Sequence, residues 1–444
     1  MIKVEGFDKA KGLLSRKSYW ESFTSSAEEE VVGRIIADVR NRGDEAIFNY
    51  TRKLDGAELS SLEVSKNEIL SAYNAIDKEL ISALELAAGK IHDFHSALQH
   101  NITSMVKQSC MSDKYLGQQI HPLDRVGLYV PGGTATYPST ALMMAIPARV
   151  AGVGEIIMTS PPAKDGKMPA ATLVAADIAG VRRIFKVGGA QAIAALAFGT
   201  QSIPKVDKIC GPGNIFVTLA KKRVYGVVAI DGLEGPSEAV IIADNTANPA
   251  LCAADLLAQA EHDPSASVIL LTTSAGLANQ VDKEIAKQLT RLKRRSIAAQ
   301  AVNAGMIVLV DHVDQAVELA NLFAPEHLSL MVSQASSLID KIHNAGCIFV
   351  GENSPIVLGD YVAGPSHVLP TGGSARFSSP LSVTSFLKFS NIVALDRTAM
   401  QELSQAAIAI AKAEGLDGHA LAVEKRLSQL LHHCESGADQ SHAI

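Results

Sequence analysis

Short runs of β-branched residues alternate with alanine-rich helical runs through the middle of the chain. A first series begins at Val126 and a second at Glu238. This alternation predicts βαβ units, whose strands lie parallel in one sheet. The expected strands are Val126–Val130, Ile156–Thr159, Arg183–Val187 and Val206–Cys210, followed by Ala239–Ala243, Val268–Thr272, Ile307–Val310 and Cys347–Val350. The chain is therefore expected to be an α/β protein.

The two series predict two Rossmann-like parallel-sheet units, each incomplete. The one sequence similarity between the two series is Ile156-Ile-Met-Thr with Ile269-Leu-Leu-Thr, so an old duplication is an alternative that the sequence leaves open. Small helical appendages are expected at both ends of the chain. The expected boundaries are a helical arm over 1–25, a larger Rossmann-like domain over 26–125 and 236–377, a second over 126–235, and a tail over 378–444.

Charge and composition argue against two classes of partner. Lys and Arg total 40 against 46 Asp and Glu, a net charge of −6, so no positive surplus favours nucleic acid. No apolar stretch is long enough for a membrane span, since Pro147 and Arg149 interrupt the run at Leu142–Ile146. Five scattered cysteines with no Cys-x-x-Cys, and an N-terminus without a secretory signal, predict a cytoplasmic protein with reduced thiols.

Three glycine turns follow strands of the first series. Such turns bring backbone amides and a helix N-terminus close to a ligand, which suits a pyrophosphate. A tight βα turn also needs glycine for purely structural reasons, and no G-x-G-x-x-G is present, so a dinucleotide would bind in a non-standard way. The turns are Val130-Pro-Gly-Gly133, Val187-Gly-Gly-Ala-Gln191 and Cys210-Gly-Pro-Gly-Asn214.

Two short motifs carry candidate polar chemistry. Gln259 and His262 are three residues apart, so on a helix both could face one ion, although a surface Gln and a solvated His would show the same spacing. Glu326 and His327 follow Pro325, and only an irregular turn would let both face one pocket. A carboxylate beside an imidazole suits two separate proton transfers at one centre.

Two further segments near the end of the second series combine glycine with titratable residues. The stretch 359–373 has neither helical nor strand periodicity and contains Asp360 and His367, which indicates a binding loop. Glu414-Gly-Leu-Asp-Gly-His419 interrupts two helical runs, and by itself could be a capping loop.

Taken together and in this order, the motifs resemble those of histidinol dehydrogenases. The resemblance extends from about residue 20 to 430 and rests on five motifs. It implies a homodimer with one zinc ion per subunit that oxidises L-histidinol through L-histidinal to L-histidine with NAD, the last steps of histidine biosynthesis. The motifs are Gly235-Pro-Ser-Glu, Gln259-Ala-Glu-His262, Ala324-Pro-Glu-His327-Leu, Gly359-Asp-Tyr through His367-Val-Leu-Pro-Thr-Gly-Gly, and Glu414-Gly-Leu-x-x-His419.

The resemblance also implies roles for individual residues. Glu326 and His327 match the catalytic bases, and the C-terminal tail crosses to the partner subunit, so that each active site is shared. The implied zinc ligands are Gln259, His262, Asp360 and His419. The implied substrate-binding residues are Ser237, Gln259, His262, His327, Asp360, His367, Glu414 and His419. The implied NAD contacts are Tyr129, Gln191 and Asn214.

Alternatives to this interpretation remain. Ser366 stands where Asn is common in the family, and Glu234 is an unusual acidic residue before Gly235, which leaves room for another small polar alcohol such as a sulfopropanediol. Cys210 could form a thiohemiacetal, as in aldehyde dehydrogenases. A non-catalytic nucleotide- or metal-binding protein is a third possibility, but Glu326 and His327 are both present.

Overall fold

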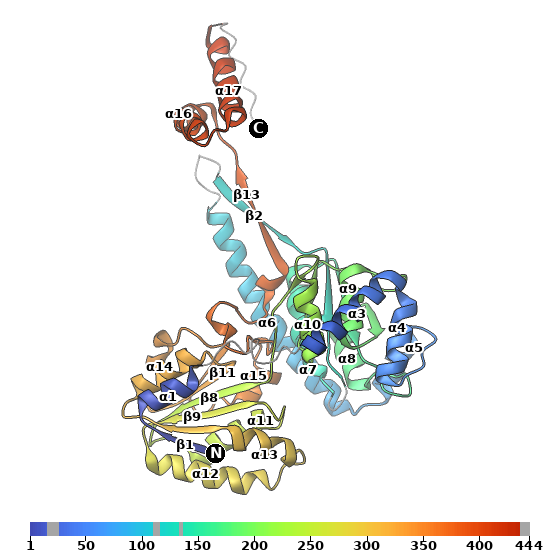
Figure 1. The fold of residues 1–444 in the computed structure, drawn as a ribbon, viewed down its shortest axis with the longest axis vertical. Helices are drawn as coiled ribbons and strands as arrows, with labels where there is room; N and C mark the ends of the chain where they lie inside the picture. Colours follow the sequence, from blue (N-terminus) through green and yellow to red (C-terminus); the bar gives the residue numbers. More distant parts are fainter. Residues whose placement is uncertain (16–25, 110–115, 133–135, 436–444) are drawn as a thin grey trace. The chain divides into compact units, whose positions relative to one another are not determined.

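The computed structural model describes residues 1–15, 26–109, 116–132 and 136–435, which form two compact units. Unit 1 comprises residues 1–99 and 122–387, and unit 2 comprises residues 100–121 and 388–444 (Figure 1). Part of the expected N-terminal arm (16–25), Gly133 of the first glycine turn, Cys110 and the end of the tail (436–444) lie outside the described residues.

All eight expected strands are present, with ends displaced by at most two residues. They form two parallel sheets in unit 1, which confirms the predicted α/β class with two Rossmann-like units (Figure 1). The six-stranded sheet has the order β1-β10-β9-β8-β11-β12, and its strands are β1 (Ile2–Glu5), β8 (Glu238–Ala243), β9 (Ser267–Thr272), β10 (Met306–Leu309), β11 (His327–Met331) and β12 (Cys347–Val350).

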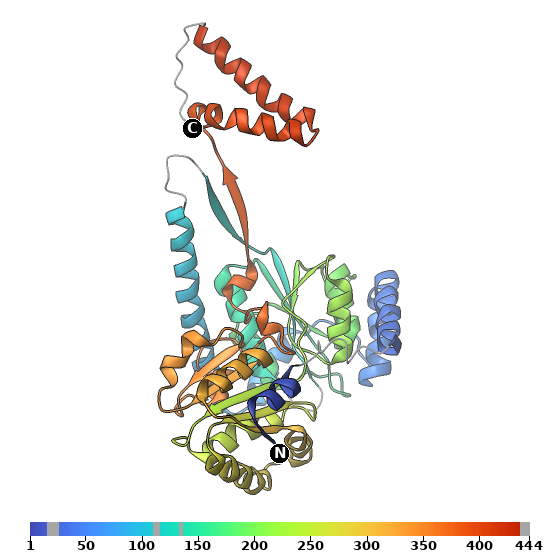
Figure 2. The same ribbon diagram turned by 60° about the vertical axis from the view of Figure 1, so that its left-hand side comes forward.

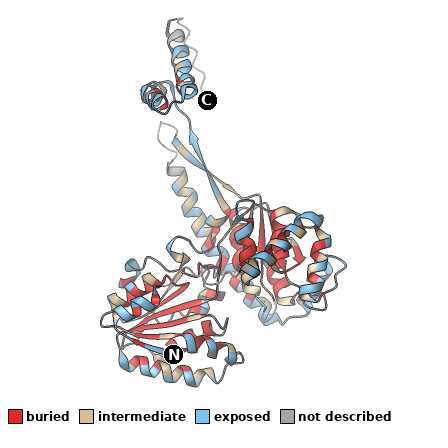
Figure 3. Ribbon diagram, viewed as in Figure 1, coloured by how far each residue is buried: buried red, intermediate tan, exposed pale blue. Residues whose placement is uncertain are grey.

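Different helices cover the two faces of the six-stranded sheet. Neighbouring residues of a strand point to opposite faces, so Ile241 packs with Leu256 of α11, whereas Val240 packs with Leu319 of α14. Both faces are therefore apolar and the central strands are buried (Figure 3). The helices are α1 (Phe7–Leu14), α11 (Pro249–Ala260), α12 (Ala275–Leu289), α13 (Arg295–Ala304), α14 (Val313–Phe323) and α15 (Ile356–Tyr361), with the 3₁₀ turns at Ala335–Lys341, Ser374–Arg376 and Val383–Phe386.

The five-stranded sheet has the order β5-β4-β3-β6-β7. Local sequence explains how its helices begin and end: α7 has Pro138 at its first position and ends at Gly152 in the left-handed conformation, and the Asn214 side chain caps α10. The elements are β3 (Arg125–Tyr129), β4 (Glu155–Ser160), β5 (Arg183–Lys186), β6 (Lys208–Cys210), β7 (Ala229–Ile230), α7 (Pro138–Ala151), α8 (Ala170–Ile178), α9 (Gly189–Phe198) and α10 (Ile215–Val224).

The helical segment 26–74 belongs with the five-stranded sheet, which corrects the domain prediction for that part of 26–125. Val32 and Ile47 share one apolar core with Phe185 and Ile193. A backbone hydrogen bond from Val64 to Ile184 adds a link. Helical periodicity identifies a buried face but does not say which sheet it covers. The elements of this segment are α3 (Ser26–Arg42), α4 (Asp44–Tyr50), the π-helical turn Thr51–Asp55 and α5 (Lys66–Asn74), and the long helix α6 (Lys78–Ser109) follows.

The N-terminus also differs from the expected helical arm. Ile2–Glu5 pair in parallel with Met306–Leu309 and form one edge of the six-stranded sheet before α1 begins. Ile2–Glu5 alternates apolar and charged residues at the edge of the sheet, so it lacks the apolar run that marks the other strands in the sequence.

Unit 2 is small and mainly helical. It holds a two-stranded sheet of β2 (Leu116–Pro122) and β13 (Leu387–Val393), whose strands lie side by side in Figure 2, and the helices α16 (Arg397–Ala413) and α17 (Asp417–Glu435). Its apolar core centres on Ile408, Ala411 and Ala420. The tail expected at 378–444 thus begins later, near 388. It forms one unit with the earlier segment 100–121. No helix among the described residues is long and apolar enough to cross a membrane.

Candidate active site

The three glycine turns lie at the carboxyl ends of β3, β5 and β6. Tyr129, the last residue of β3, is buried and its hydroxyl accepts a hydrogen bond from Gly189 N at 3.1 Å, which joins the first turn to the second. Burial raises the pKa of this phenol to about 12, so it stays protonated. The turn after β6 begins at Gly211, with φ +121°, where a Cβ would lie 2.1 Å from the Tyr129 carbonyl oxygen. Only glycine fits there.

Two of the three expected NAD contacts have distinct local surroundings. Asn214 is exposed, and its Oδ1 accepts hydrogen bonds from Phe216 N and Val217 N at the start of α10. Gln191 is 1% exposed, and its buried Oε1 has no hydrogen-bond partner among the described residues. The turns therefore combine a helix N-terminus with polar side chains, which is the chemistry that binds a dinucleotide.

A second group of polar side chains meets at the amino ends of β8 and β11. His327 is the first residue of β11 and Glu238 the first of β8, and these strands are paired. Gln259 is the last residue but one of α11, the helix that precedes β9. All three are at most 3% exposed. Side chains from three elements thus converge in the interior of unit 1.

An irregular turn does bring Glu326 and His327 together. Ala324 has φ 53°, the only positive φ of a non-glycine residue in the described chain, and Pro325 follows it. Glu326 Oε2 then lies 3.5 Å from His327 Nδ1 and accepts a hydrogen bond from Glu238 N at 2.9 Å. The unusual backbone therefore serves to turn two adjacent side chains toward one place.

The imidazole of His327 is fixed at both nitrogens by acceptors. Nδ1 lies 3.1 Å from the Glu238 carbonyl oxygen, and Nε2 lies 3.1 Å from Asp360 Oδ1. Burial alone would lower the His327 pKa, but the carboxylates of Glu326 and Asp360 raise it. Since a carbonyl oxygen only accepts, Nδ1 keeps its proton and Nε2 is the nitrogen that can exchange one.

The pKa values of the two carboxyls of the site are shifted in opposite directions. For Glu326, which is 8% exposed, burial raises the pKa to about 8, into the range where a carboxyl can lose and regain a proton near neutral pH. For Asp360, burial acts in the same direction but is outweighed by the hydrogen bond from His327 and by nearby imidazoles, so its pKa is lowered. Asp360 therefore stays ionised.

Asp360, on α15, connects most of the candidate residues. Besides His327, its Oδ2 accepts from Gln259 Nε2 at 3.1 Å, and its carbonyl oxygen accepts from His367 Nδ1 at 2.7 Å. His367 Nε2 also lies 3.1 Å from the Thr140 hydroxyl. The His262 side chain is close enough for the Asp360 charge to raise its pKa, although burial has the larger effect and lowers it.

Comparison with known proteins decides the family. The family model for histidinol dehydrogenase matches residues 20–427. Two histidinol dehydrogenases, from Dehalococcoides mccartyi (strain CBDB1) and Clostridium acetobutylicum, are 54% and 48% identical to this chain. The alignments cover 96% and 94% of this chain, and 99% and 97% of those proteins.

This chain belongs to the histidinol dehydrogenase family. A crystal structure of histidinol dehydrogenase from Elizabethkingia anophelis has 37% identity and a TM-score of 0.89, with 97% of this chain and 98% of that chain covered. The fold therefore agrees with the family over almost the whole chain, and not only at the motifs.

The residues in unit 1 fit the zinc ion that the histidinol dehydrogenase family implies, but only as part of a ligand set. Gln259 Oε1 is buried and has no hydrogen-bond partner among the described residues, as expected for an oxygen atom that binds a cation. Asp360 supplies an ionised carboxylate, and burial favours the neutral imidazole of His262. Among the described residues, no group of three or more His, Cys, Asp or Glu could hold a metal ion.

Three other residues expected from the family are less closely connected. Ser237 precedes β8, and its backbone carbonyl accepts from Ser267 N. Glu414 and His419 lie in unit 2, at the end of α16 and the start of α17, and both are exposed. Unit 1 by itself thus gathers Gln259, His262 and Asp360 of the expected zinc ligands.

Sequence reasoning missed residues that hold the site in place. Glu238 bonds through its backbone to both Glu326 and His327, and its carboxylate accepts from Gly372 N. Asp255 is 6% exposed, one helical turn before Gln259, and accepts a hydrogen bond from the backbone N–H of Ile356 at the start of α15. Its spacing of four residues from Gln259 was a signal that could have been used.

The structure argues against a cysteine nucleophile. Cys210 is fully buried at the end of β6, and burial raises its thiol pKa well above the ordinary value. A thiol of this kind is a small apolar side chain with little thiolate. Ser366, the other residue in question, is also buried and donates to the Met143 carbonyl oxygen.

Proposed function

We propose that this chain is a zinc-containing, NAD-dependent enzyme that oxidises L-histidinol through L-histidinal to L-histidine. One observation carries the proposal: Glu326 and His327 meet in a buried site next to Asp360 and the free oxygen of Gln259. A site of this kind offers two proton-transfer groups beside a partial cation site, which is what two successive oxidations of one carbon require.

In this proposal the residues divide the proton transfers. Gln259, His262 and Asp360 would hold the zinc ion, which would orient the substrate's imidazole and amine, and NAD would supply the hydride acceptor for each oxidation. His327 takes the hydroxyl proton at Nε2 while the alcohol becomes the aldehyde, because Nδ1 is held by Glu238. Glu326 then takes a proton from water as its oxygen adds to the aldehyde carbon. Before the second oxidation His327 passes the first proton to solvent, and it then takes the remaining hydroxyl proton as the hydrate becomes the acid.

The coupling of the two oxidations explains why one site is used for both. Oxidation of a primary alcohol by NAD is unfavourable near neutral pH, whereas oxidation of an aldehyde hydrate to a carboxylate is strongly favourable. Burial of Glu326 and His327 excludes bulk water and keeps the aldehyde in place between the steps.

The remaining assignments are also proposals. Residues Tyr129, Gln191 and Asn214 contact NAD, and Ser237, His367 and Glu414 contact the substrate. His419 of the partner subunit completes the zinc site of a symmetric homodimer. The free thiols of Cys210, Cys252 and Cys347 support a cytoplasmic location, where cysteines stay reduced.

One assay tests the function. Purified protein with zinc, L-histidinol and excess NAD should give two NADH and one histidine for each histidinol consumed. Release of aldehyde after one NADH would contradict the proposal. Turnover of a sulfopropanediol but not of histidinol would instead favour the alternative family activity that Ser366 and Glu234 leave open.

A further inference from the structure

A buried ion cluster beside the third glycine turn has no part in the proton transfers above. Lys221, on α10, lies with its Nζ 2.6 Å from Asp231 Oδ1 and 2.6 Å from Glu234 Oε2. The three side chains are 1%, 5% and 9% exposed. The third ammonium donor bonds to the Gly211 carbonyl oxygen at 2.9 Å, so all three donors are used.

The cluster holds both backbone polar groups of Gly211. While Lys221 donates to its carbonyl oxygen, Asp231 Oδ2 accepts from its N–H at 2.6 Å. Gly211 has the backbone conformation that only glycine adopts, packed against the Tyr129 carbonyl. The cluster therefore fixes the first residue of the Gly211–Asn214 turn, where we place part of the NAD site.

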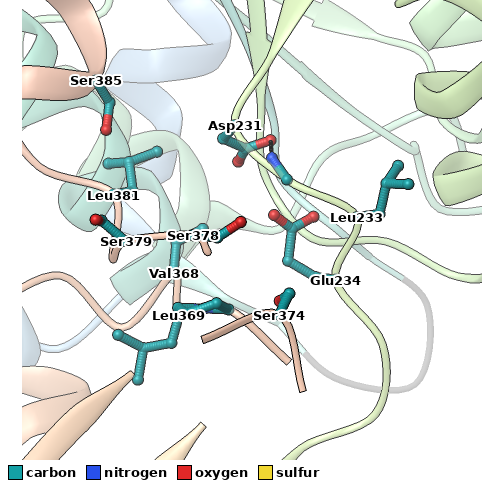
Figure 4. A pocket seen from close by; sticks show the side chains of 12 residues that line it. Asp231, Leu233, Glu234, Val368, Leu369, Ser374, Ser378, Ser379, Leu381 and Ser385 are labelled. Carbon is teal, nitrogen blue, oxygen red and sulfur yellow. Dashed lines mark hydrogen bonds between the residues drawn. The ribbon is translucent and has the colours of Figure 1, made fainter. Parts of the chain in front are cut away.

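Asp231 is also the first residue of a short segment, 231–238, whose last residue is hydrogen-bonded to the Glu326 carboxyl. Asp231 and Glu234 face each other at the wall of a pocket that Leu369 and Ser374 also line (Figure 4). Further along, Gly235 N donates to Thr371 Oγ1 at 2.6 Å, and Glu238 N donates to Glu326 Oε2 at 2.9 Å. Segment 231–238 thus joins the glycine turn to Glu326 through hydrogen bonds at both ends.

The buried cluster has one positive and two negative groups, so it is a poor source of folding stability. One ammonium faces two carboxylates, and burial together with the Asp231 charge raises the Glu234 pKa to about 7. For Lys221 burial would lower the pKa, but the two carboxylates raise it. Desolvation offsets much of the attraction in such clusters, whereas their fixed geometry remains available for positioning.

We propose that Lys221 is a positioning residue for NAD. Held between Asp231 and Glu234, it sets the conformation of the Gly211–Asn214 turn at the carboxyl end of β6 and ties that turn to segment 231–238. The inference rests on the proposed function, because it requires NAD to bind at this turn. It also gives Glu234 a role in cofactor binding rather than in substrate choice.

The test compares Lys221→Met with Lys208→Met. Lys208 is on the same strand-turn unit, at the other end of β6, and donates to the Ser385 carbonyl oxygen at 2.8 Å. We expect Lys221→Met to raise KM for NAD and Kd for NADH about tenfold, since small misplacements of a binding turn are costly. KM for histidinol and the zinc content should stay at wild-type values, and Lys208→Met should leave all four quantities unchanged.

Two substitutions at Glu234 complete the test. Glu234→Gln keeps an acceptor for Lys221 and should bind NADH as the wild type does, whereas Glu234→Ala removes it and should weaken binding about threefold. If Lys221→Met does not fold, the comparison of Glu234→Gln with Glu234→Ala tests the inference by itself. Lower thermal stability in folded variants whose KM for NAD and Kd for NADH are unchanged would overturn the inference. An inactive wild type would instead count against the proposed function, because NADH binding is measured separately.

Discussion

The two sheets of unit 1 have a similar strand order, but their candidate binding groups lie at opposite ends of the strands. In each, the first strand of the series is central: β3 has β4 and β5 on one side and β6 and β7 on the other, and β8 has β9 and β10 on one side and β11 and β12 on the other. The glycine turns of the five-stranded sheet are at carboxyl ends. Glu238 and His327 of the six-stranded sheet are at amino ends.

This difference follows from what each edge of a parallel sheet offers. At the carboxyl ends the chain turns into helix N-termini, whose free N–H groups and positive dipole attract phosphate. At the amino ends it arrives from helix C-termini, which favour cations. His262 lies just beyond the C-terminus of α11, beside Gln259. One edge therefore suits a dinucleotide bound by backbone, and the other a metal bound by side chains.

The largest expected effect is at the amino edge. Glu326→Gln should slow formation of histidine about a thousandfold, but slow oxidation of histidinol to the aldehyde less than about tenfold, because water is activated only in the second stage. Quenched single-turnover reactions measure the two stages separately. The control is Glu238→Gln, which keeps an acceptor for Gly372 N and should leave both stages nearly unchanged. Equal losses at both stages in Glu326→Gln would contradict this division.

Removal of the metal tests whether the amino edge depends on it for function or for folding. A strong chelator should lower activity at least about a hundredfold while the circular dichroism spectrum is retained. The reason is that Gln259 and Asp360 are on helices α11 and α15, whose apolar residues pack against the sheet without the metal. Added zinc should restore activity. Loss of the helical signal on chelation would indicate a structural metal instead.

Complementation between inactive variants tests whether unit 2 completes the amino edge of the partner. His262→Ala and His419→Ala proteins, each inactive, are unfolded together and refolded as a mixture. Random pairing makes half of the dimers mixed, and in each of these one of two sites is intact, so about a quarter of wild-type activity should return. Either variant refolded alone is the control. No recovery would show that His419 serves its own chain.

The smallest effect is expected at the carboxyl edge, in the glycine turns where we propose that NAD binds. Gly211→Ala should raise KM for NAD about tenfold and lower the free energy of unfolding by about 2 kcal/mol, because a Cβ collides with Tyr129. Gly226→Ala is the matched control: φ is also positive, at +100°, but no atom lies within 4 Å of the added Cβ. It should lose some stability and keep the KM. A changed KM in both variants would mean that strain alone is responsible.

Much of the fold could be predicted from sequence because local patterns specify it. Strands such as Ile156–Thr159 are short apolar runs bounded by turns, and the structure places them within one residue of the prediction. The glycine turns could be found for the same reason, since tight turns require particular residues. The motifs around Gln259 and Glu326 pointed to the right family, as the comparisons confirm.

The amino-acid sequence by itself thus determined the strands, the turns and the family. Only the tertiary structure decided that 26–64 packs on the five-stranded sheet, that the Glu326–His327 site is at amino ends, and that Lys221 bonds to Asp231 and Glu234. The physical reason is that turns and strands depend on neighbouring residues. The choice of packing face and the pairing of buried charges depend on residues far apart in the chain, about which hydrophobic periodicity gives no information.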